Sequence, residues 1–431
     1  MSKEENRKNF SKYVSQNILG MIGFSCYVLA DSYFISIAKG ADGLTALNLV
    51  MPLYSIIFSI GEMIGVGSAI RYAISKIKKD ADADDYFWNA LIWCILSSML
   101  FVFAGIFFSA DIMRVLGADE HIVAVGNNYT KIFMCFAPMF MCNYVTNAFV
   151  RNDGAPGIAM SATLFSSLFN IVFDYILMFP MNLGMEGAAL ATALSPIIGM
   201  GICSIHFFSK KSSVRLVVCK PSVRKLVAGC QLGVSAFVGE MSSAVITLAF
   251  NFVILKLAGN VGVAAYGVVA NIAIVTTAVF NGVAQGSQPL ISSCFGRGDK
   301  DGCTQLKRMG YTTAFVLAAV MYSILFIFAG QFVAVFNSEG SEMLRLYATE
   351  GVKLYFIGIF FAGINIVGGG AFSATEDAFK AAVVSVARGF VLILGAVFVM
   401  SALFGMTGVW LAYAVAEGIT TFIMLVMAMR V

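Results

Sequence analysis

The stretch GMEGAALATA at 184–193 returns as GMTGVWLAYA at 405–414, about half the chain length later. A second set of identical residues recurs at a constant offset of 219 positions. These pairs are Gly40/Gly259, Gly43/Gly262, Ala46/Ala265, Gly67/Gly286, Ser68/Ser287, Asp80/Asp299 and Asp82/Asp301. One such match would be chance in so apolar a sequence, but a series in register indicates two related halves. Two related halves with a site between them are the usual plan of a secondary transporter.

The composition is that of a membrane protein. Hydrophobic residues make up 59% of the chain and charged residues only 12%, and the mean hydropathy is +0.86. A soluble globular domain carries about 25% charged residues. Uncharged runs such as 86–110 and 389–416 exceed the roughly 20 residues that a helix needs to cross a bilayer. The composition therefore predicts an all-α integral membrane protein.

Twelve transmembrane helices are predicted, six in each half of the chain. Their approximate bounds are 13–37, 44–76, 86–110, 121–150, 156–180, 187–208, 225–257, 262–294, 305–334, 342–373, 379–402 and 407–429. Because six is an even number, both halves enter the membrane in the same direction and form a parallel repeat. The expected parts are an N-terminal tail (1–12), an N-terminal six-helix lobe (13–208), a basic linker (209–224) and a C-terminal six-helix lobe (225–431). The two pseudo-symmetric lobes are expected to enclose a central cleft.

The distribution of Lys and Arg predicts the orientation in the membrane. With both termini in the cytoplasm, 22 of the 28 Lys and Arg residues fall in cytoplasmic segments and 6 lie at the outer side. This split follows the positive-inside rule. The basic linker is expected to rest on anionic lipid headgroups. We expect a multi-pass protein of the cell's inner (plasma) membrane with lipids as partners. The net charge of +4 comes largely from these flanks, so nucleic acid is not a predicted partner.

Polar residues inside the predicted helices point to a site. Asp31 lies near the outer end of the first predicted helix, and Thr192 lies about one turn into the sixth. Asn170 and Asp174 are four residues apart, so they share one face of the fifth predicted helix. Counting about 1.5 Å per residue, Asp31, Asp174 and Thr192 sit at nearly the same depth. Charge at this depth costs on the order of 2.5 kcal/mol or more per Asp, so intramembrane acids are functional candidates by default.

Two carboxylates, an amide oxygen and a hydroxyl at one level predict a cation site. Hard cations such as sodium prefer oxygen ligands, and the neutral oxygens of Asn170 and Thr192 favour sodium as the metal ion there. A proton is the alternative, because burial and a neighbouring carboxylate both favour the protonated form of a carboxyl group. A purely structural role, in which each Asp caps a loop or pairs with a lysine, is a further alternative.

Several motifs resemble those of the multidrug and toxic compound extrusion (MATE) family. DSYF at 31–34 is similar to the family's first-helix Asp-x-x-Phe, and ALNLVMP at 46–52 to its second-helix opening. FVRNDGAP at 149–156 resembles the (F/L)-x-R-x-D-G-x-P turn after helix 4. NIVFD at 170–174, followed by GAALAT at 187–192, matches the N-x-x-x-D and G-x-A-x-A-T elements. The order and spacing of the set, which covers nearly the whole chain, make the resemblance specific.

The resemblance implies roles for individual residues. In the family, the matching Asp, Asn, Asp and Thr form a cation site in the N-terminal lobe, which implies cation coupling for four residues. These are Asp31, Asn170, Asp174 and Thr192. The family also has an acid on helix 7, and Glu240 falls at the matching place. An acid that other relatives carry on helix 10 has no match here, and Asn365 is the nearest intramembrane polar residue. Glu62, deep in the second predicted helix, is a further candidate for lining a cavity or for coupling.

The expected function is secondary active antiport by alternating access. The chain is predicted to export amphipathic, often cationic organic compounds in exchange for sodium or protons. A lipid-linked saccharide flippase of the same superfamily is the alternative, although such proteins tend to have more spans and a basic cavity. A membrane enzyme would need a nucleophile–base pair or a metal cluster, and a channel would need a repeated pore loop or charged ring. No such pattern is found, so no enzymatic activity and no cofactor other than the coupling ion is expected. The monomer is the expected functional unit.

Overall fold

The structure is a computed structural model that describes residues 3–336 and 341–429, and every regular element within them is a helix. The first half contains α1 (Lys3–Lys78), α2 (Asp85–Val115), α3 (Glu120–Cys135), α4 (Ala137–Asn152), α5 (Pro156–Met178) and α6 (Gly184–Phe207). The second half contains α7 (Val223–Gly296), α8 (Lys300–Ile327), α9 (Ala329–Phe336), α10 (Glu342–Tyr355), η1 (Phe356–Gly358), α11 (Ile359–Ala374), α12 (Ala378–Val386), η2 (Ala387–Val391) and α13 (Leu392–Met429).

Three of these helices contain a glycine at which one membrane span ends and the next begins. The backbone of α1, α7 and α13 leaves helical geometry at Gly40 (φ 57°), Gly259 (φ 61°) and Gly405 (φ 58°). Glycine is the residue that adopts positive φ without a steric cost. Gly40 and Gly259 recur in the sequence because each turns the chain between the first and second spans of its half.

The number of spans in the described chain agrees with the sequence. Nine helices are long and apolar enough to cross a membrane, and the bent pair α3 and α4, which meet at 46°, makes a tenth. In that count α7 and the segment Ala378–Met427 are each one helix, so cutting them at Gly259 and Gly405 gives twelve. The prediction of an all-α fold with twelve spans in two lobes is therefore confirmed.

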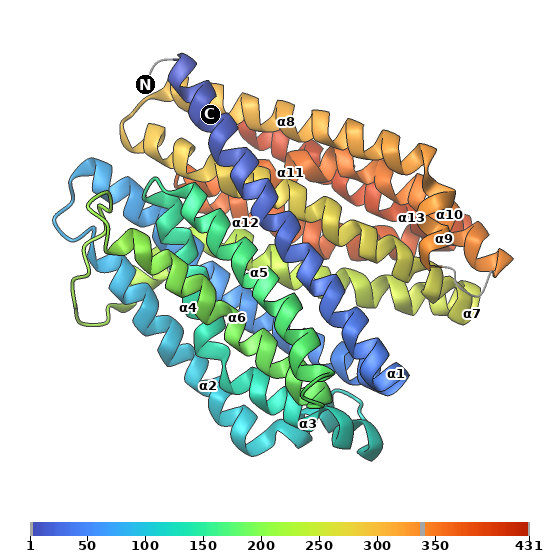
Figure 1. The fold of residues 1–431 in the computed structure, drawn as a ribbon. Helices are drawn as coiled ribbons and strands as arrows, with labels where there is room; N and C mark the ends of the chain where they lie inside the picture. Colours follow the sequence, from blue (N-terminus) through green and yellow to red (C-terminus); the bar gives the residue numbers. More distant parts are fainter. Residues whose placement is uncertain (1–2, 337–340, 430–431) are drawn as a thin grey trace.

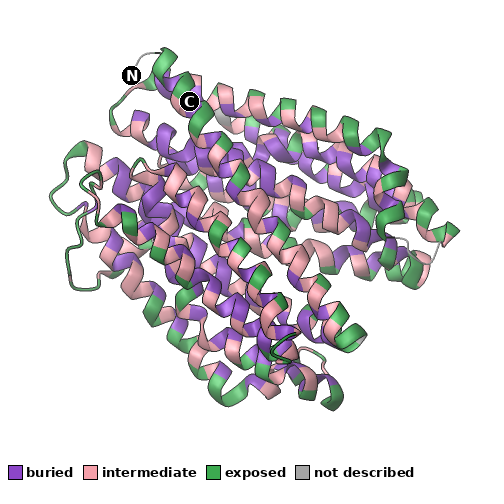
Figure 2. Cartoon of the chain, in the orientation of Figure 1, coloured by how far each residue is buried: buried purple, intermediate pink, exposed green. Residues whose placement is uncertain are grey.

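Large apolar side chains cover the outer faces of the lobes. On α2, the exposed fractions of Leu100 and Phe107 are 69% and 64%. Figure 2 shows exposed and half-buried residues along the outer helices, and buried residues where helices meet. Hydrophobic surface on this scale is typical of contact with lipid, and the chain is a multi-pass membrane protein.

The helices of each half gather into one lobe, and the two lobes diverge from a shared end (Figure 1). This end holds the linker between α6 and α7 and both ends of the described chain, and we call it the linker end. The first arm of α1 begins at Lys3, within the stretch predicted as a tail. Its polar turns pack on the opposite lobe, where Asn6 Nδ2 donates to Gln305 Oε1 over 3.2 Å and Phe10 is buried.

Glycines let the lobes approach each other near the linker end. A Cβ at Gly67 would lie 2.0 Å from the carbonyl oxygen of Gly229 on α7. A Cβ at Gly286, the partner of Gly67 in the sequence repeat, would lie 2.7 Å from the Cα of Val14 on α1. Each half therefore presents one glycine to a helix of the other half, which explains why this pair recurs.

An ion pair also joins the lobes at the linker end. Arg71 on α1 donates to the carboxylate of Glu376 and, through Nε, to the carbonyl oxygen of Ala228 over 3.1 Å. Lys78 Nζ lies 3.4 Å from Glu376 Oε2. Glu376 adopts a left-handed backbone (φ 59°) after α11, and Gly154 (φ 89°) takes the same geometry after α4. The second half thus places a carboxylate between the lobes at a turn that favours glycine.

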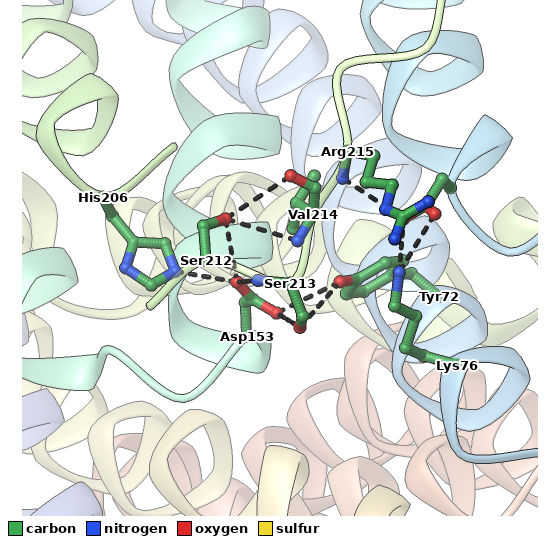
Figure 3. Close-up of polar contacts among 9 residues, drawn as sticks. Tyr72, Lys76, Asp153, His206, Ser212, Ser213, Val214 and Arg215 are labelled. Atoms are coloured by element: carbon green, nitrogen blue, oxygen red, sulfur yellow. Dashed lines mark hydrogen bonds and ion pairs between the residues drawn. The ribbon is translucent and has the colours of Figure 1, made fainter. Parts of the chain in front are cut away.

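Asp153, the acid of the motif at 149–156, holds the linker against the N-terminal lobe (Figure 3). Its Oδ2 accepts from the backbone nitrogen of Ser213 over 2.9 Å and lies 2.8 Å from His206 Nε2. Its Oδ1 accepts from the Ser213 hydroxyl and, over 3.1 Å, from the Tyr72 hydroxyl. The side chains of Asp153 and His206 are almost completely buried. This cluster fixes the start of the linker in place.

Accessibility labelling is expected to place the linker end in the cytoplasm, as the charge distribution predicts. Val218 in the linker and Val115 at the opposite end of α2 are 76% and 86% exposed. In a background without native cysteines, Val115→Cys should react with an impermeant maleimide on intact cells. Val218→Cys should react only after permeabilisation. Reaction of Val218→Cys on intact cells would show the reverse orientation.

Candidate functional site

The four residues of the predicted cation site lie together inside the N-terminal lobe. Asp31 comes from the first arm of α1, Asn170 and Asp174 from α5, and Thr192 from α6. With its nitrogen toward Asp174, the Asn170 amide donates to Asp174 Oδ2 over 3.1 Å and accepts from the Thr192 hydroxyl over 3.2 Å. Asp31 lies close enough to Asp174 for the two carboxylates to interact electrostatically.

Two carboxylate oxygens of this site lack a hydrogen-bond partner among the described residues. They are Oδ1 of Asp31 and Oδ1 of Asp174, and both side chains are buried. A buried polar atom without a partner costs about 1–3 kcal/mol, and more when it is charged. Protonation of each carboxyl group, or an oxygen-seeking cation beside it, would supply the missing partner.

The donor set fits a small hard cation that uses neutral oxygens as well as carboxylates. Across the described residues, no group of three or more His, Cys, Asp or Glu could hold a metal ion. A sodium ion at this site would therefore depend on Asn170 and Thr192 in addition to the two acids. Oxygen donors of this kind are the ligands that hard cations prefer.

Glycines bring α5 and α6 together at the site. A Cβ at Gly187 would lie 2.8 Å from the carbonyl carbon of Leu177, so a larger residue would push the helices apart. Gly184 (φ 51°) turns the chain into α6 just after the end of α5. This close packing positions Thr192 against Asn170, and it gives a physical reason for the glycines of the repeated stretch.

A cavity of about 110 Å³ extends to within one helical turn of the four-residue site. Tyr27, four residues before Asp31, and Ser167, three residues before Asn170, both line it. Its wall also contains aromatic side chains from several helices. These are Phe24, Phe58, Phe140 and Tyr144. The cavity therefore offers an aromatic surface beside two carboxylates.

Charged residues from both lobes line the same cavity. Glu62 and Arg151 come from the N-terminal lobe, and Glu240 comes from the C-terminal lobe. Gln285 on α7 accepts from Arg151 Nη1 over 2.6 Å and donates to Glu62 Oε1 over 3.2 Å. Two of the candidates from the sequence, Glu62 and Glu240, are thus brought to one cavity, and a polar chain crosses between the lobes beside them.

Asn365, the remaining candidate, lies elsewhere, in the core of the C-terminal lobe. Its Nδ2 donates to the backbone oxygen and to Oε2 of Glu417 over 2.9 Å and 2.7 Å. Arg388 Nη2 donates to Glu417 Oε1 over 2.6 Å. The structure separates Asn365 from the N-terminal cavity and places it in a buried ion-pair cluster.

Arg151 and Gln285 are two polar cavity residues that sequence reasoning did not select. Arg151 belongs to the motif at 149–156, but the motif does not show that its side chain faces a cavity. Gln285 carried no signal, because its contacts with Arg151 and Glu62 cross between lobes that are far apart in the sequence.

Comparison with known proteins agrees with this architecture. The MatE family matches residues 17–176 and 236–399, which is most of both halves. The chain belongs to the MATE family. It is therefore a transporter and not an enzyme.

Curated relatives and solved structures match almost the whole chain. The multidrug export protein MepA of Staphylococcus aureus is 27% identical over 93% of this chain and 89% of its own length. MepA of Staphylococcus saprophyticus is 26% identical with the same coverage. An outward-facing multidrug resistance MATE transporter of the MOP superfamily superposes with a TM-score of 0.92 at 20% identity, over 99% of this chain and 96% of that chain. A MOP superfamily transporter from Pyrococcus furiosus superposes with a TM-score of 0.91 at 20% identity and the same coverage.

Proposed function

We propose that this MATE transporter exports amphipathic, often cationic organic compounds in exchange for sodium or protons. The observation that carries the proposal is the pair of buried oxygens on Asp31 and Asp174 that lack a hydrogen-bond partner in the described part of the chain, within one helical turn of an aromatic cavity. The relatives named as multidrug export proteins support the same cargo class.

The cavity supports a cationic rather than an anionic cargo. It contains two carboxylates, Glu62 and Glu240, and one guanidinium, that of Arg151. Aromatic faces and carboxylates together attract organic cations. The same charge balance argues against the alternative of a lipid-linked saccharide flippase, whose phosphate-bearing cargo would favour a basic cavity.

Exchange follows if the coupling ion and the cargo favour different conformations. A ligand shifts a conformational equilibrium only by its differential affinity for the two states. We propose that cation occupancy at Asp31 and Asp174 favours the state that releases cargo outside the cell, and that cargo binding in turn weakens cation binding. Both lobes belong to one chain, and the monomer in a plasma membrane is the proposed functional unit.

The identity of the coupling ion is tested by Thr192→Val in proteoliposomes. The substitution removes one oxygen ligand and keeps the shape of the side chain. If sodium is the coupling ion, the sodium concentration that gives half-maximal dye efflux should rise roughly tenfold, because a bond to a charged partner is lost. If the proton is the coupling ion, efflux at fixed sodium should hardly change.

A buried threonine outside the site is the matched control for this experiment. Thr130→Val also removes a buried hydroxyl, but that hydroxyl donates to the carbonyl oxygen of Gly126 in its own helix. Thr130→Val should leave the sodium dependence at the wild-type value. Dye efflux that needs neither a sodium gradient nor a proton gradient would contradict the proposed antiport.

A further inference from the structure

The C-terminal lobe contains a buried charge cluster that the proposed transport site does not use. Glu417 Oε1 accepts from Nη2 and Nε of Arg388 over 2.6 Å and 3.1 Å. Asn365 Nδ2 donates to Glu417 Oε2 over 2.7 Å, and the Thr421 hydroxyl donates to Asn365 Oδ1 over 3.0 Å. The side chains of Glu417 and Arg388 are only 3% and 16% exposed. Glu417 is thus surrounded by donors, and one of them carries a positive charge.

Aromatic rings stand beside this ion pair. Tyr355 and Tyr413 stack with their ring centroids 4.3 Å apart and their planes 4° from parallel. Both rings lie within electrostatic reach of Arg388. Tyr413 is also within hydrogen-bonding reach of Arg388 and within electrostatic reach of Glu417.

A local break in helical geometry carries Arg388. The turn η2 is a π-helical turn, in which the Leu392 backbone nitrogen donates to the Ala387 carbonyl oxygen. Gly389 in this turn packs closely on α7, where a Cβ would lie 2.6 Å from the Cβ of Ser242. Single π turns inside α-helices occur frequently at functional sites, because the extra residue redirects the side chains next to it.

The internal repeat relates this cluster to the N-terminal cavity. Gly154 and Glu376 are left-handed turn residues 222 positions apart, and Gly184 and Gly405 are left-handed turn residues 221 positions apart. These offsets pair each of three residues that line the N-terminal cavity with a member of the charge cluster. The pairs are Asn143/Asn365, Ser166/Arg388 and Pro196/Glu417. The Arg388–Glu417 ion pair of the C-terminal lobe therefore lies at positions whose counterparts line the cavity in the N-terminal lobe.

In the C-terminal lobe, aromatic residues occupy the positions that match Asp31 and Thr192 of the N-terminal cation site. At an offset of 219 Asp31 corresponds to Phe250, and at an offset of 221 Thr192 corresponds to Tyr413. Phe250 is fully buried and packs on Tyr355 with ring centroids 5.8 Å apart. The C-terminal lobe thus lacks the matching acid and has gained a charge pair one helical turn beyond Tyr413.

We propose that Glu417, Asn365 and Tyr413 form a second cation site, specific for planar guanidinium-type cations, whose resident cation is the side chain of Arg388. Bidentate contact with a carboxylate is the geometry that guanidinium groups favour. Because Arg388 is covalently attached, this site does not exchange its cation with the solution. Only the N-terminal lobe then takes up and releases a coupling ion, a consequence that rests on the proposed function. The binding site itself does not rest on that function.

The site is tested by removing the resident cation and offering a free one. Arg388→Ala leaves Glu417 buried without its charged partner, so the purified variant should unfold at a lower temperature than the wild type. Guanidinium chloride at about 10 mM, far below denaturing concentrations, should raise the unfolding temperature of Arg388→Ala by roughly 3 °C. The wild type, whose site is filled, should show no such rise, and sodium chloride at the same ionic strength should not replace guanidinium.

The double variant Arg388→Ala, Glu417→Gln is the matched control, because it keeps the cavity and removes the carboxylate. It should show no stabilisation by guanidinium. If Arg388→Ala does not fold, Arg388→Gln retains one neutral donor toward Glu417 and should show a smaller rise of the unfolding temperature with guanidinium. Equal stabilisation of the single and double variants, or none in the single variant, would overturn the proposal. Because the measurement uses unfolding and not efflux, this result is independent of the coupling ion and of the cargo.

The consequence for coupling has its own measurement in proteoliposomes. Arg388→Ala should lose at least about fivefold in dye efflux, and guanidinium on both sides of the membrane should restore most of that loss while the dependence on the driving ion stays as in the wild type. If Arg388 serves only to stabilise the fold, guanidinium should restore the stability of Arg388→Ala without restoring its efflux. A changed dependence on the driving ion in Arg388→Ala filled with guanidinium would contradict the consequence that only the N-terminal lobe exchanges a coupling ion.

Discussion

Replacing Asp174 with asparagine is expected to reduce gradient-driven efflux to the level of protein-free vesicles. The Asp174 side chain is fully buried, its Oδ1 has no partner among the described residues, and it interacts with Asp31. Asparagine has nearly the same shape but cannot take up a proton or contribute a full negative charge to a sodium site. Without differential cation binding, a gradient no longer shifts the conformational equilibrium. Efflux of a fluorescent cation from proteoliposomes under imposed sodium and proton gradients measures the effect.

Two further observations separate lost coupling from lost folding. Asp174→Asn should bind the same dye, since the cavity wall is unchanged, and it should unfold within a few degrees of the wild type. Asp111→Asn is the matched control, because Asp111 is a largely exposed acid that pairs with Arg114 at the surface of α2. Asp111→Asn should transport at the wild-type rate. Wild-type efflux by Asp174→Asn would remove this acid from coupling.

The N-terminal site could be predicted from the sequence because local geometry determines it. The spacing of Asn170 and Asp174 puts both on one face of a helix, and the length of each span gives the depth of Asp31 and Thr192. These rules need no knowledge of how helices rotate against each other. The structure brings the four residues together, while their role in coupling stays a prediction.

Contacts that depend on helix rotation or on the approach of two lobes could not be predicted. Arg388, which pairs with Glu417, lies in a π turn that no sequence pattern predicts. Asn365 is a transport candidate only as the polar residue nearest to an acid that other family members carry on helix 10, and its side chain faces the C-terminal core. Hydropathy placed the start of the first helix at residue 13, because it does not register polar turns, such as the one with Asn6, that pack against another lobe.

Gly67→Val is expected to block transport by preventing the lobes from meeting at the linker end. A Cβ at this position would lie 2.0 Å from the Gly229 carbonyl oxygen, well inside the 3.4 Å at which ordinary contact begins. The lobes must part by more than about 1 Å, and the added methyl groups of valine increase this separation. We expect efflux to fall at least tenfold, since the conformation closed at the linker end becomes unfavourable while the core of each lobe is untouched.

The separation of the lobes can be measured directly with spin labels. Labels at Asp80 and Lys300, which are exposed near the linker end on opposite lobes, should show longer distances in Gly67→Val than in the wild type. Gly201→Val is the matched control, because a Cβ at Gly201 on α6 has no heavy atom within 4 Å. It should transport normally and give the wild-type distance distribution. An unchanged distance distribution in Gly67→Val would mean that the helices accommodate the side chain without separating, and the recurring glycine pair would then need another explanation.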